Sequence, residues 1–160
     1  MEEKILEEKT YGIGEVSRMF ALPVSTLRYY DKEGLFPGLP KTASGIRQFR
    51  TRDIEALRLI ECLKKAGMEI RDIKEFMQWC AQGPSTYAQR KEMLLRQKAT
   101  VEKELERMNQ VLDMIRYKCW YYDVAIAHGN EEYLKTVTPE DMPEDIRTAW
   151  QNAHKEDADP

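Results

Sequence analysis

The sequence predicts a mainly α fold, in which a winged helix-turn-helix domain is followed by a long dimerisation coiled-coil helix. Two short helical patterns flank a turn at residues 21–23, which is the spacing of a helix-turn-helix. A short segment with a glycine turn and strand-like alternation comes next, as expected of a wing. Further along, residues 85–119 contain no glycine or proline and carry apolar side chains at a seven-residue repeat.

The helix-turn-helix is expected at residues 13–32. Apolar side chains recur at helical spacing over residues 13–20 and again over residues 24–32, so each stretch has one inward face. Pro23 separates the two helices because proline cannot continue a helix. Gly34 is expected to end the second helix as a left-handed cap.

The wing and further helices follow in order. Residues 42–45 form a predicted turn between two short strands, the second of which covers residues 46–49. Thr51 is expected to cap a third helix that ends near Ala66. A fourth helix is predicted at residues 70–81. Its expected buried residues are Ile73, Phe76, Met77 and Cys80.

The helix at residues 85–119 would be roughly 50 Å long at about 1.5 Å per residue. Its two seven-residue series are Tyr87, Leu94, Val101, Met108 and Ile115, and Lys91, Lys98, Leu105, Leu112 and Cys119. The small N-terminal domain is too short to cover so long a stripe, which favours pairing with a second copy, parallel or antiparallel. The alternative is a helix that folds back on the third and fourth helices. A last short helix is expected to start near Pro143.

Charge is distributed unevenly along the chain. Charged residues make up 33% of the sequence and the net charge is −3, yet residues 11–68 carry a net +4 and residues 130–160 a net −6. A basic N-terminal region is compatible with a DNA partner. The acidic start of the chain lacks the apolar segment of a signal peptide, and no stretch is apolar enough to span a membrane, so a cytoplasmic protein is expected.

Catalytic and metal chemistry find little support in the sequence. His128 and His154 lie in no recognisable arrangement with a serine, a cysteine or paired carboxylates, so neither a catalytic residue nor an enzyme is predicted. Cys62, Cys80 and Cys119 are far apart and form no CxxC pair. No metal site and no cofactor is therefore expected.

The second helix of the helix-turn-helix concentrates side chains suited to DNA. Arg28 has a planar guanidinium that fits guanine edges or phosphates. Ser25 and Thr26 lie near the helix N-terminus, where free N–H groups favour phosphates. Of the adjacent Tyr29 and Tyr30, one is expected to be buried and the other exposed. The wing adds Lys41, Ser44, Arg47 and Arg50. An alternative role for Arg50 is to stabilise only the third helix.

Ordered motifs in residues 11–82 resemble the MerR family of bacterial transcription regulators. The block TLRYYD at residues 26–31 stands in register with the wing sequence SGIR at residues 44–47. The other matching segments are YGIGE at 11–15, GL at 34–35, DI at 53–54, AG at 66–67 and IRDIK at 70–74. Pro23, Ile46 and Glu69 depart from the family pattern, where the recognition helix has a hydroxyl cap, the wing a tyrosine and the fourth helix its usual cap.

The resemblance implies an antiparallel coiled-coil homodimer that binds a pseudo-palindromic promoter. On binding an effector, such a dimer distorts the DNA and realigns the promoter elements for RNA polymerase. The chain then divides into an N-terminal extension (1–10), a winged helix-turn-helix DNA-binding domain (11–82), a dimerisation helix (85–119) and a short C-terminal effector or packing segment (120–160). The candidate DNA-binding residues are Tyr11, Ser25, Thr26, Arg28, Tyr29, Tyr30, Lys41, Ser44, Arg47 and Arg50.

The candidate effector residues are Cys119, Trp120, Tyr121 and Tyr122. They can form an apolar pocket for a small molecule, provide a reactive thiol at Cys119 beside Lys118, or only pack. This segment resembles the short-tailed, non-metal branch of the family, which includes regulators that answer aldehydes, electrophiles or oxidative stress. Two alternatives stay open. One is a metal-responsive regulator, although the region at Ser85 lacks the thiol of metal-sensing relatives, and the other is an architectural protein that bends DNA without an effector.

Overall fold

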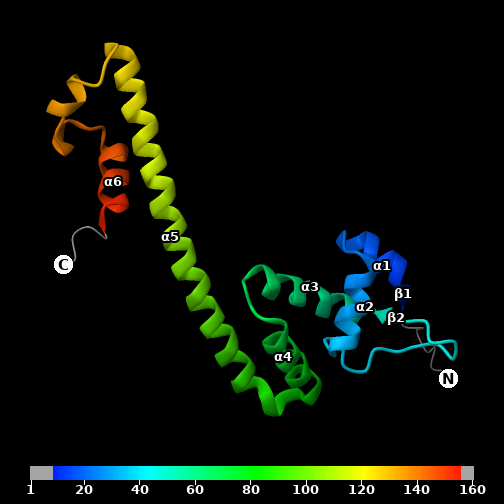
Figure 1. Ribbon diagram of the computed structural model, residues 1–160. Coiled ribbons are helices and arrows are strands. Elements are labelled where there is room, and N and C mark those ends of the chain that lie inside the picture. Colours follow the sequence, from blue (N-terminus) through cyan, green and yellow to red (C-terminus); the bar gives the residue numbers. More distant parts are fainter. Residues whose placement is uncertain (1–8, 156–160) are drawn as a thin grey trace, which may run out of the picture. The chain divides into compact units, whose positions relative to one another are not determined.

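The computed structural model describes residues 9–155 and divides into two compact units at Lys98 and Ala99, which we call the N-terminal and C-terminal units. Figure 1 shows their helices and strands. In chain order these are β1 (Thr10–Gly12), α1 (Ile13–Phe20), α2 (Val24–Glu33), β2 (Gln48–Arg50), α3 (Thr51–Lys65), α4 (Ile70–Gln82), η1 (Gly83–Thr86), α5 (Tyr87–His128), η2 (Tyr133–Thr136), η3 (Pro139–Asp141) and α6 (Glu144–Ala153). The mainly helical class predicted from the sequence is confirmed.

The two helices of the helix-turn-helix lie where the periodicity predicts them. Helix α1 ends at Ala21, which has a left-handed backbone (φ 51°), and α2 begins directly after Pro23. Gly34 closes α2 with φ 85°, a conformation that is costly for residues with a Cβ. Its N–H donates to the carbonyl of Asp31 at 3.0 Å, which completes the helix end.

The wing differs from the predicted two-stranded hairpin. Strand β2 pairs antiparallel with β1, a strand the sequence analysis missed, and Thr10 of β1 falls in the predicted N-terminal extension, whose residues 1–8 lie outside the described part of the chain. The other arm of the hairpin keeps only one isolated bridge, between Lys41 and Arg47. Pro40 lacks an N–H and so cannot extend this ladder, although its carbonyl accepts the N–H of Gln48 at 2.9 Å.

Helix α3 is capped differently from the prediction. Thr51 is the first residue inside the helix, and the N-cap is Arg50. The carboxylate of Asp53 accepts the backbone N–H of Arg50 at 2.9 Å, so the cap is supplied by the acidic residue of the first turn. In α4, Ile73, Phe76 and Met77 are buried as predicted, whereas Cys80 is only partly buried.

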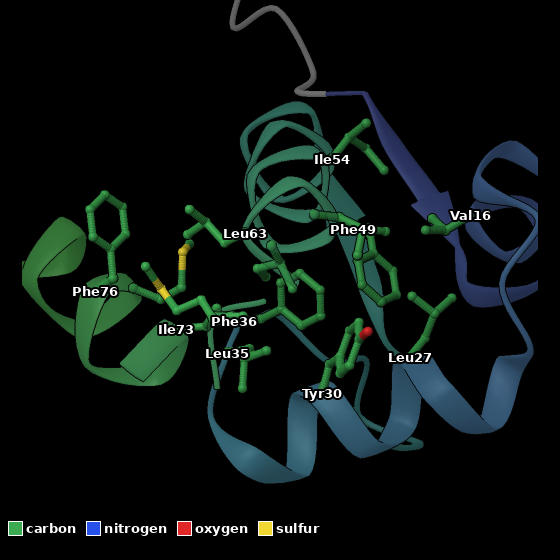
Figure 2. Close-up of a cluster of buried hydrophobic side chains, with 14 of the residues drawn as sticks. Val16, Leu27, Tyr30, Leu35, Phe36, Phe49, Ile54, Leu63, Ile73 and Phe76 are labelled. Atoms are coloured by element: carbon green, nitrogen blue, oxygen red, sulfur yellow. The ribbon is translucent and has the colours of Figure 1, made fainter. Parts of the chain in front are cut away.

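One hydrophobic core holds the N-terminal unit together. Figure 2 shows Leu27 and Tyr30 of α2 pointing toward Phe49 of β2, while Phe36 approaches the Phe49 ring edge-on at 5.5 Å. Leu27 and Phe49 are fully buried. Met93, from the second turn of α5, belongs to the same core. The start of the long helix is therefore part of the DNA-binding unit and not a separate rod.

Helix α5 is longer than predicted. It continues past Cys119 to His128 and spans 42 residues. Gly129, with φ 72°, is the first residue that favours a different backbone conformation, and no glycine or proline precedes it after Pro84. Trp120, Tyr121 and Tyr122 consequently belong to this helix and not to a separate C-terminal segment.

The C-terminal unit packs α6 against the second half of α5. Asp113 of α5 is buried; its carboxylate accepts hydrogen bonds from Asn152 of α6 at 3.1 Å and from Arg116 at 3.0 Å. Tyr117 and His154 meet edge-on with ring centroids 6.5 Å apart. The predicted helix near Pro143 is confirmed, because α6 starts at the next residue.

A stripe of exposed apolar side chains follows α5, and we call it the α5 seam. It keeps the seven-residue repeats of the sequence and extends them to Tyr122 and Ile126, the latter 78% exposed. Leu105 and Leu112 in the middle are 59% and 43% exposed. So long a row of exposed aliphatic side chains is typical of a protein–protein contact.

Tyr30 offers a test of the core. Its hydroxyl donates to Glu61 at 2.8 Å and accepts from Lys64 at 2.5 Å. Tyr30→Phe should lower the free energy of unfolding by about 1 kcal/mol at neutral pH, because two hydrogen bonds are lost. Burial, and next the Glu61 hydrogen bond and charge, raise the pKa of Tyr30.

The raised pKa of Tyr30 also determines how the stability difference between wild type and Tyr30→Phe depends on pH. The folded state favours the neutral phenol, so the contribution is complete below the unfolded-state pKa of about 10 and is lost as the pH rises above it. Urea titrations at pH 7 and above pH 10 measure the free energy of unfolding of both proteins. The difference between wild type and Tyr30→Phe should be smaller at the higher pH. A gap that widens at alkaline pH would contradict the buried, neutral tyrosine.

Candidate nucleic-acid interface

The turn between α1 and α2 is fixed by local hydrogen bonds. Ser17 Oγ donates to the carbonyl of Leu22 at 2.5 Å, and the Leu22 N–H donates to the Ser17 carbonyl at 3.0 Å. The left-handed Ala21 turns the chain between them. Pro23 offers no side-chain cap, and its carbonyl instead accepts the N–H of Thr26 at 3.0 Å. The entry angle of α2 is thus set without the hydroxyl cap.

Helix α2 has one exposed face that is polar and cationic. Ser25, Arg28, Tyr29 and Lys32 follow helical spacing and are all exposed, while Thr26 is half-buried at the edge of this face. Arg28 has no ion pair with any residue that the structure describes. Lys32 was not among the sequence candidates, although its spacing from Arg28 would have identified it.

The structure removes Tyr30 from this face. Tyr30 is 1% exposed and its hydroxyl already binds Glu61 and Lys64, whereas Tyr29 is 46% exposed. The expectation of one buried and one exposed tyrosine is met. Tyr30 as a DNA-contacting residue is a prediction that this burial contradicts, because no part of its ring or hydroxyl is left for a phosphate.

An ion-pair cluster joins the wing to α2. Asp31, near the end of α2, lies 2.7 Å from Arg47 Nε and 3.1 Å from Lys41 Nζ. Lys41 and Arg47 face each other across the isolated bridge of the wing, and the Asp31 carboxylate is largely buried between them. Because charge-assisted pairs with a shared carboxylate restrict both partners, the wing keeps a fixed direction relative to the recognition helix.

The remaining candidates have different surroundings. Arg50 binds Asp53 through Nε at 2.8 Å and the Gly38 carbonyl at 3.0 Å, so it stabilises the start of α3 and the loop before β2. These contacts support the alternative role that the sequence analysis gives Arg50, which is to stabilise the third helix. Ser44 is exposed at the wing turn, where its hydroxyl lies 2.9 Å from that of Thr42. Tyr11 is half-buried in β1, with Lys9 Nζ 4.9 Å from its ring centre.

The four effector candidates separate into two pairs. Cys119 and Trp120 line a groove of about 620 Å³ between α5 and α6, which we call the acidic groove. The other lining residues are Ile115, Arg116, Asp123, Pro143, Asp145 and Ile146. Tyr121 and Tyr122 do not line it, and their rings meet edge-on at 5.3 Å.

Lys118, the cation next to Cys119 in the sequence hypothesis, contacts two aromatic rings. The ammonium of Lys118 lies over the rings of Tyr117 and Tyr121, 5.5 and 4.9 Å from their centres, which is a cation–π arrangement. Tyr121 also donates to Glu131 at 2.9 Å, and this hydrogen bond raises the pKa of Tyr121. Cys119 itself is an exposed free thiol.

Neither a metal cluster nor a membrane helix is found in the part of the chain that the structure describes. Within residues 9–155, no three His, Cys, Asp or Glu side chains gather closely enough to hold a metal ion. In the same range, no helix combines the length and apolar character needed to cross a bilayer.

A helix-turn-helix whose second helix exposes a cationic face, braced by a wing, defines a DNA-binding protein. Two family descriptions match the chain: "MerR HTH family regulatory protein" over residues 11–79 and "MerR, DNA binding" over residues 54–117. The chain belongs to the MerR family of helix-turn-helix transcription regulators. It is therefore a DNA-binding transcription regulator and not an enzyme.

Three similar proteins are matched over nearly their whole length. An uncharacterized HTH-type transcriptional regulator of Haemophilus influenzae is 33% identical, over 84% of this chain and 98% of that protein. The structure of HiNmlR, described as a MerR family regulator lacking the sensor domain, bound to promoter DNA, has a TM-score of 0.67 and 32% identity over 78% of this chain and 99% of that one. A MerR family regulator from Bacillus thuringiensis has a TM-score of 0.63 and 38% identity over 69% of this chain and 97% of that one.

Arg28 provides the first test of the interface. Replacing it with alanine should weaken binding to the specific site by about 1–3 kcal/mol and relax the preference at one position in each half-site, if the guanidinium contacts a base edge. Arg107→Ala, an exposed arginine of α5, is the matched control and should bind normally. Equal losses on specific and random DNA would make Arg28 a phosphate contact, and no loss would exclude this helix face.

Asp31 tests whether the wing must be held in place. In Asp31→Ala, the wing keeps its cations but loses the carboxylate that orients them. We expect the ratio of specific to random DNA affinity to fall several-fold, while random binding stays equal or becomes stronger. Glu55→Ala removes the same charge from an exposed ion pair of α3 and is the control. Fluorescence anisotropy with both DNAs measures the ratio; an unchanged ratio would show that the wing needs no such anchor.

Proposed function

We propose that the protein binds a pseudo-palindromic promoter as a homodimer and activates transcription by distorting the DNA in response to a small molecule or electrophile. The exposed face of α2 carries the DNA part of this proposal. Ser25, Arg28, Tyr29 and Lys32 would enter the major groove, and Lys41 and Arg47 of the wing would lie beside the neighbouring backbone. The structure of HiNmlR bound to promoter DNA aligns with 78% of this chain and supports this arrangement.

The α5 seam supports the homodimer. A single copy leaves Leu105, Met108 and Leu112 exposed along one side of the helix, and pairing with a second α5 would bury them. A dimer also matches the two-fold symmetry of a palindromic site, because each copy then reads one half. Residues 87–128 thus replace residues 85–119 as the proposed dimerisation helix.

Activation by distortion follows from the energy scale of DNA bending. Bending a promoter site costs on the order of 1–6 kcal/mol, so a change of dimer geometry worth about 1–3 kcal/mol can shift the balance between two DNA shapes. In this proposal the ligand acts at the acidic groove, where Cys119 and Trp120 lie. RNA polymerase then engages the realigned promoter.

One experiment tests the function as a whole. DNA fragments flanking the protein's own gene are footprinted, and the protected promoter is transcribed in vitro with RNA polymerase. We expect a two-fold symmetric footprint between the promoter elements and a rise in transcript on adding an electrophilic aldehyde such as acrolein. A footprint and bend without any response to acrolein or to a panel of apolar small molecules would favour the architectural alternative.

The dimer assignment has its own test. Leu105→Glu combined with Leu112→Glu should convert the protein to monomers, because four carboxylates would enter the centre of the seam. Lys103→Glu combined with Gln110→Glu, at exposed or partly exposed positions outside the seam series, is the control. Light scattering that still gives a dimer mass for the seam variant would contradict this interface.

Single substitutions in the acidic groove separate the two effector hypotheses. If the signal is covalent, Cys119→Ser should bind promoter DNA normally but give no transcriptional response to acrolein. If the groove only binds a ligand, Trp120→Ala should lose the response while Cys119→Ser keeps it. Tyr121→Phe lies outside the groove and should respond as wild type. In vitro transcription with the three variants measures the outcome, and three normal responses would place the effector site elsewhere.

A further inference from the structure

Ile46 is an exposed apolar side chain at the turn of the wing. It is 59% exposed, more than any other large apolar residue that the structure describes before α5. The residues before it in the turn, Ala43, Ser44 and Gly45, are exposed as well, so Ile46 contributes little to the core. Because the side chain has no donor or acceptor, it also has nothing to offer a phosphate.

Three hydrogen bonds close the turn that presents Ile46. The Thr42 N–H donates to the Ile46 carbonyl at 2.8 Å, and the Ile46 N–H donates to Thr42 Oγ1 at 3.0 Å. Gly45, with φ 81°, donates its N–H to the Thr42 carbonyl at 2.8 Å. A β-branched side chain on such a turn has few rotamers. Ile46 therefore loses little conformational freedom when a partner contacts it.

The cations on either side of this turn determine where Ile46 would lie on DNA. Lys41 and Arg47 face each other across the isolated bridge, and both pair with Asp31 of α2. Residues 42–46 form the turn beyond that bridge. With α2 in the major groove and the two cations beside the adjacent phosphates, the turn reaches past this backbone. The groove on the other side of the same backbone is the minor groove.

An isoleucine can distinguish base pairs in the minor groove by shape alone. There a G·C pair differs from an A·T pair by the N2 amine of guanine. This amine takes up space on the floor of the groove, and an apolar side chain placed against it would remove its hydrogen bonds to water. An A·T pair leaves the same space free, so the side chain can make van der Waals contacts with the sugars and the base edges.

We propose that Ile46 is a specificity-determining residue that selects A·T pairs in the minor groove at the flank of each half-site. This inference rests on the proposed promoter binding, and it adds a base preference at pairs that α2 does not contact. The wing then divides its tasks. Lys41 and Arg47 supply affinity through the phosphates, which carry no sequence information, and Ile46 supplies selectivity.

Selection from DNA with randomised flanks tests the preference. The half-sites that the wild-type protein protects are kept, and the base pairs on both sides of each are randomised. We expect wild type to enrich A·T at symmetric flank positions, and Ile46→Ser to lose this enrichment while it still requires the half-sites. Ile46→Val keeps an apolar, β-branched side chain, and Ala43→Ser adds a hydroxyl at an exposed position of the same turn, so both controls should keep the enrichment. Equal flank enrichment by wild type and Ile46→Ser would overturn the proposal.

Base analogues at the selected flank positions show which groove is read. Inosine·C has the major-groove groups of G·C without the N2 amine, and 2,6-diaminopurine·T adds that amine to A·T. Wild type should bind A·T and inosine·C roughly fivefold or more tightly than G·C and 2,6-diaminopurine·T, and for Ile46→Ser the difference should fall below about twofold. Fluorescence anisotropy gives the dissociation constants. Inosine·C bound like G·C, or a difference that Ile46→Ser retains, would overturn the proposal.

The two proposals fail in distinguishable ways. A protein that protects no symmetric promoter site would remove the promoter binding on which both depend. A normal footprint without an A·T preference at the flanks would leave promoter binding standing and exclude the role of Ile46 alone. Because Ile46 is exposed, Ile46→Ser should unfold at the same temperature as wild type, and thermal unfolding of both proteins separates a lost contact from a lost fold.

Discussion

Burial of one side of α2 is the constraint on which the DNA-binding face depends. Leu27 and Tyr30 are held against Phe49, and a helix of 3.6 residues per turn must then direct Arg28 outward. The same register brings Asp31 to the edge of α2, where one carboxylate binds the two wing cations. The core therefore determines which side chains face DNA and at what angle the wing stands beside them.

The sequence predicts most of the helices because their signals are local. Periodicity and glycine positions identify α1, α2 and α4, and the seven-residue repeat identifies α5. Strand β1 has only three residues, and its partner β2 lies nearly forty positions away, so no local pattern reveals it. The sequence prediction ends this helix at Cys119, whereas the residue that changes the backbone conformation is Gly129.

The candidate site, like the helices, can be predicted from the sequence only where its signal is local. Exposed positions of α2 follow from its period, which also points to Lys32. The roles of Tyr30 and Arg50 depend on partners distant in sequence or on a loop carbonyl: Glu61 for the tyrosine hydroxyl, and Gly38, besides the neighbouring Asp53, for the guanidinium. A residue type suited to DNA is therefore assigned correctly only when its tertiary partners are known.

The long helix connects the two chemical parts of the protein. Met93 packs into the core of the N-terminal unit, and Asp113 anchors α6 through Asn152, so the two ends of α5 are held by different units while the seam between them stays uncovered. A helix resists bending far more than a loop does, so a displacement at one end is carried to the other.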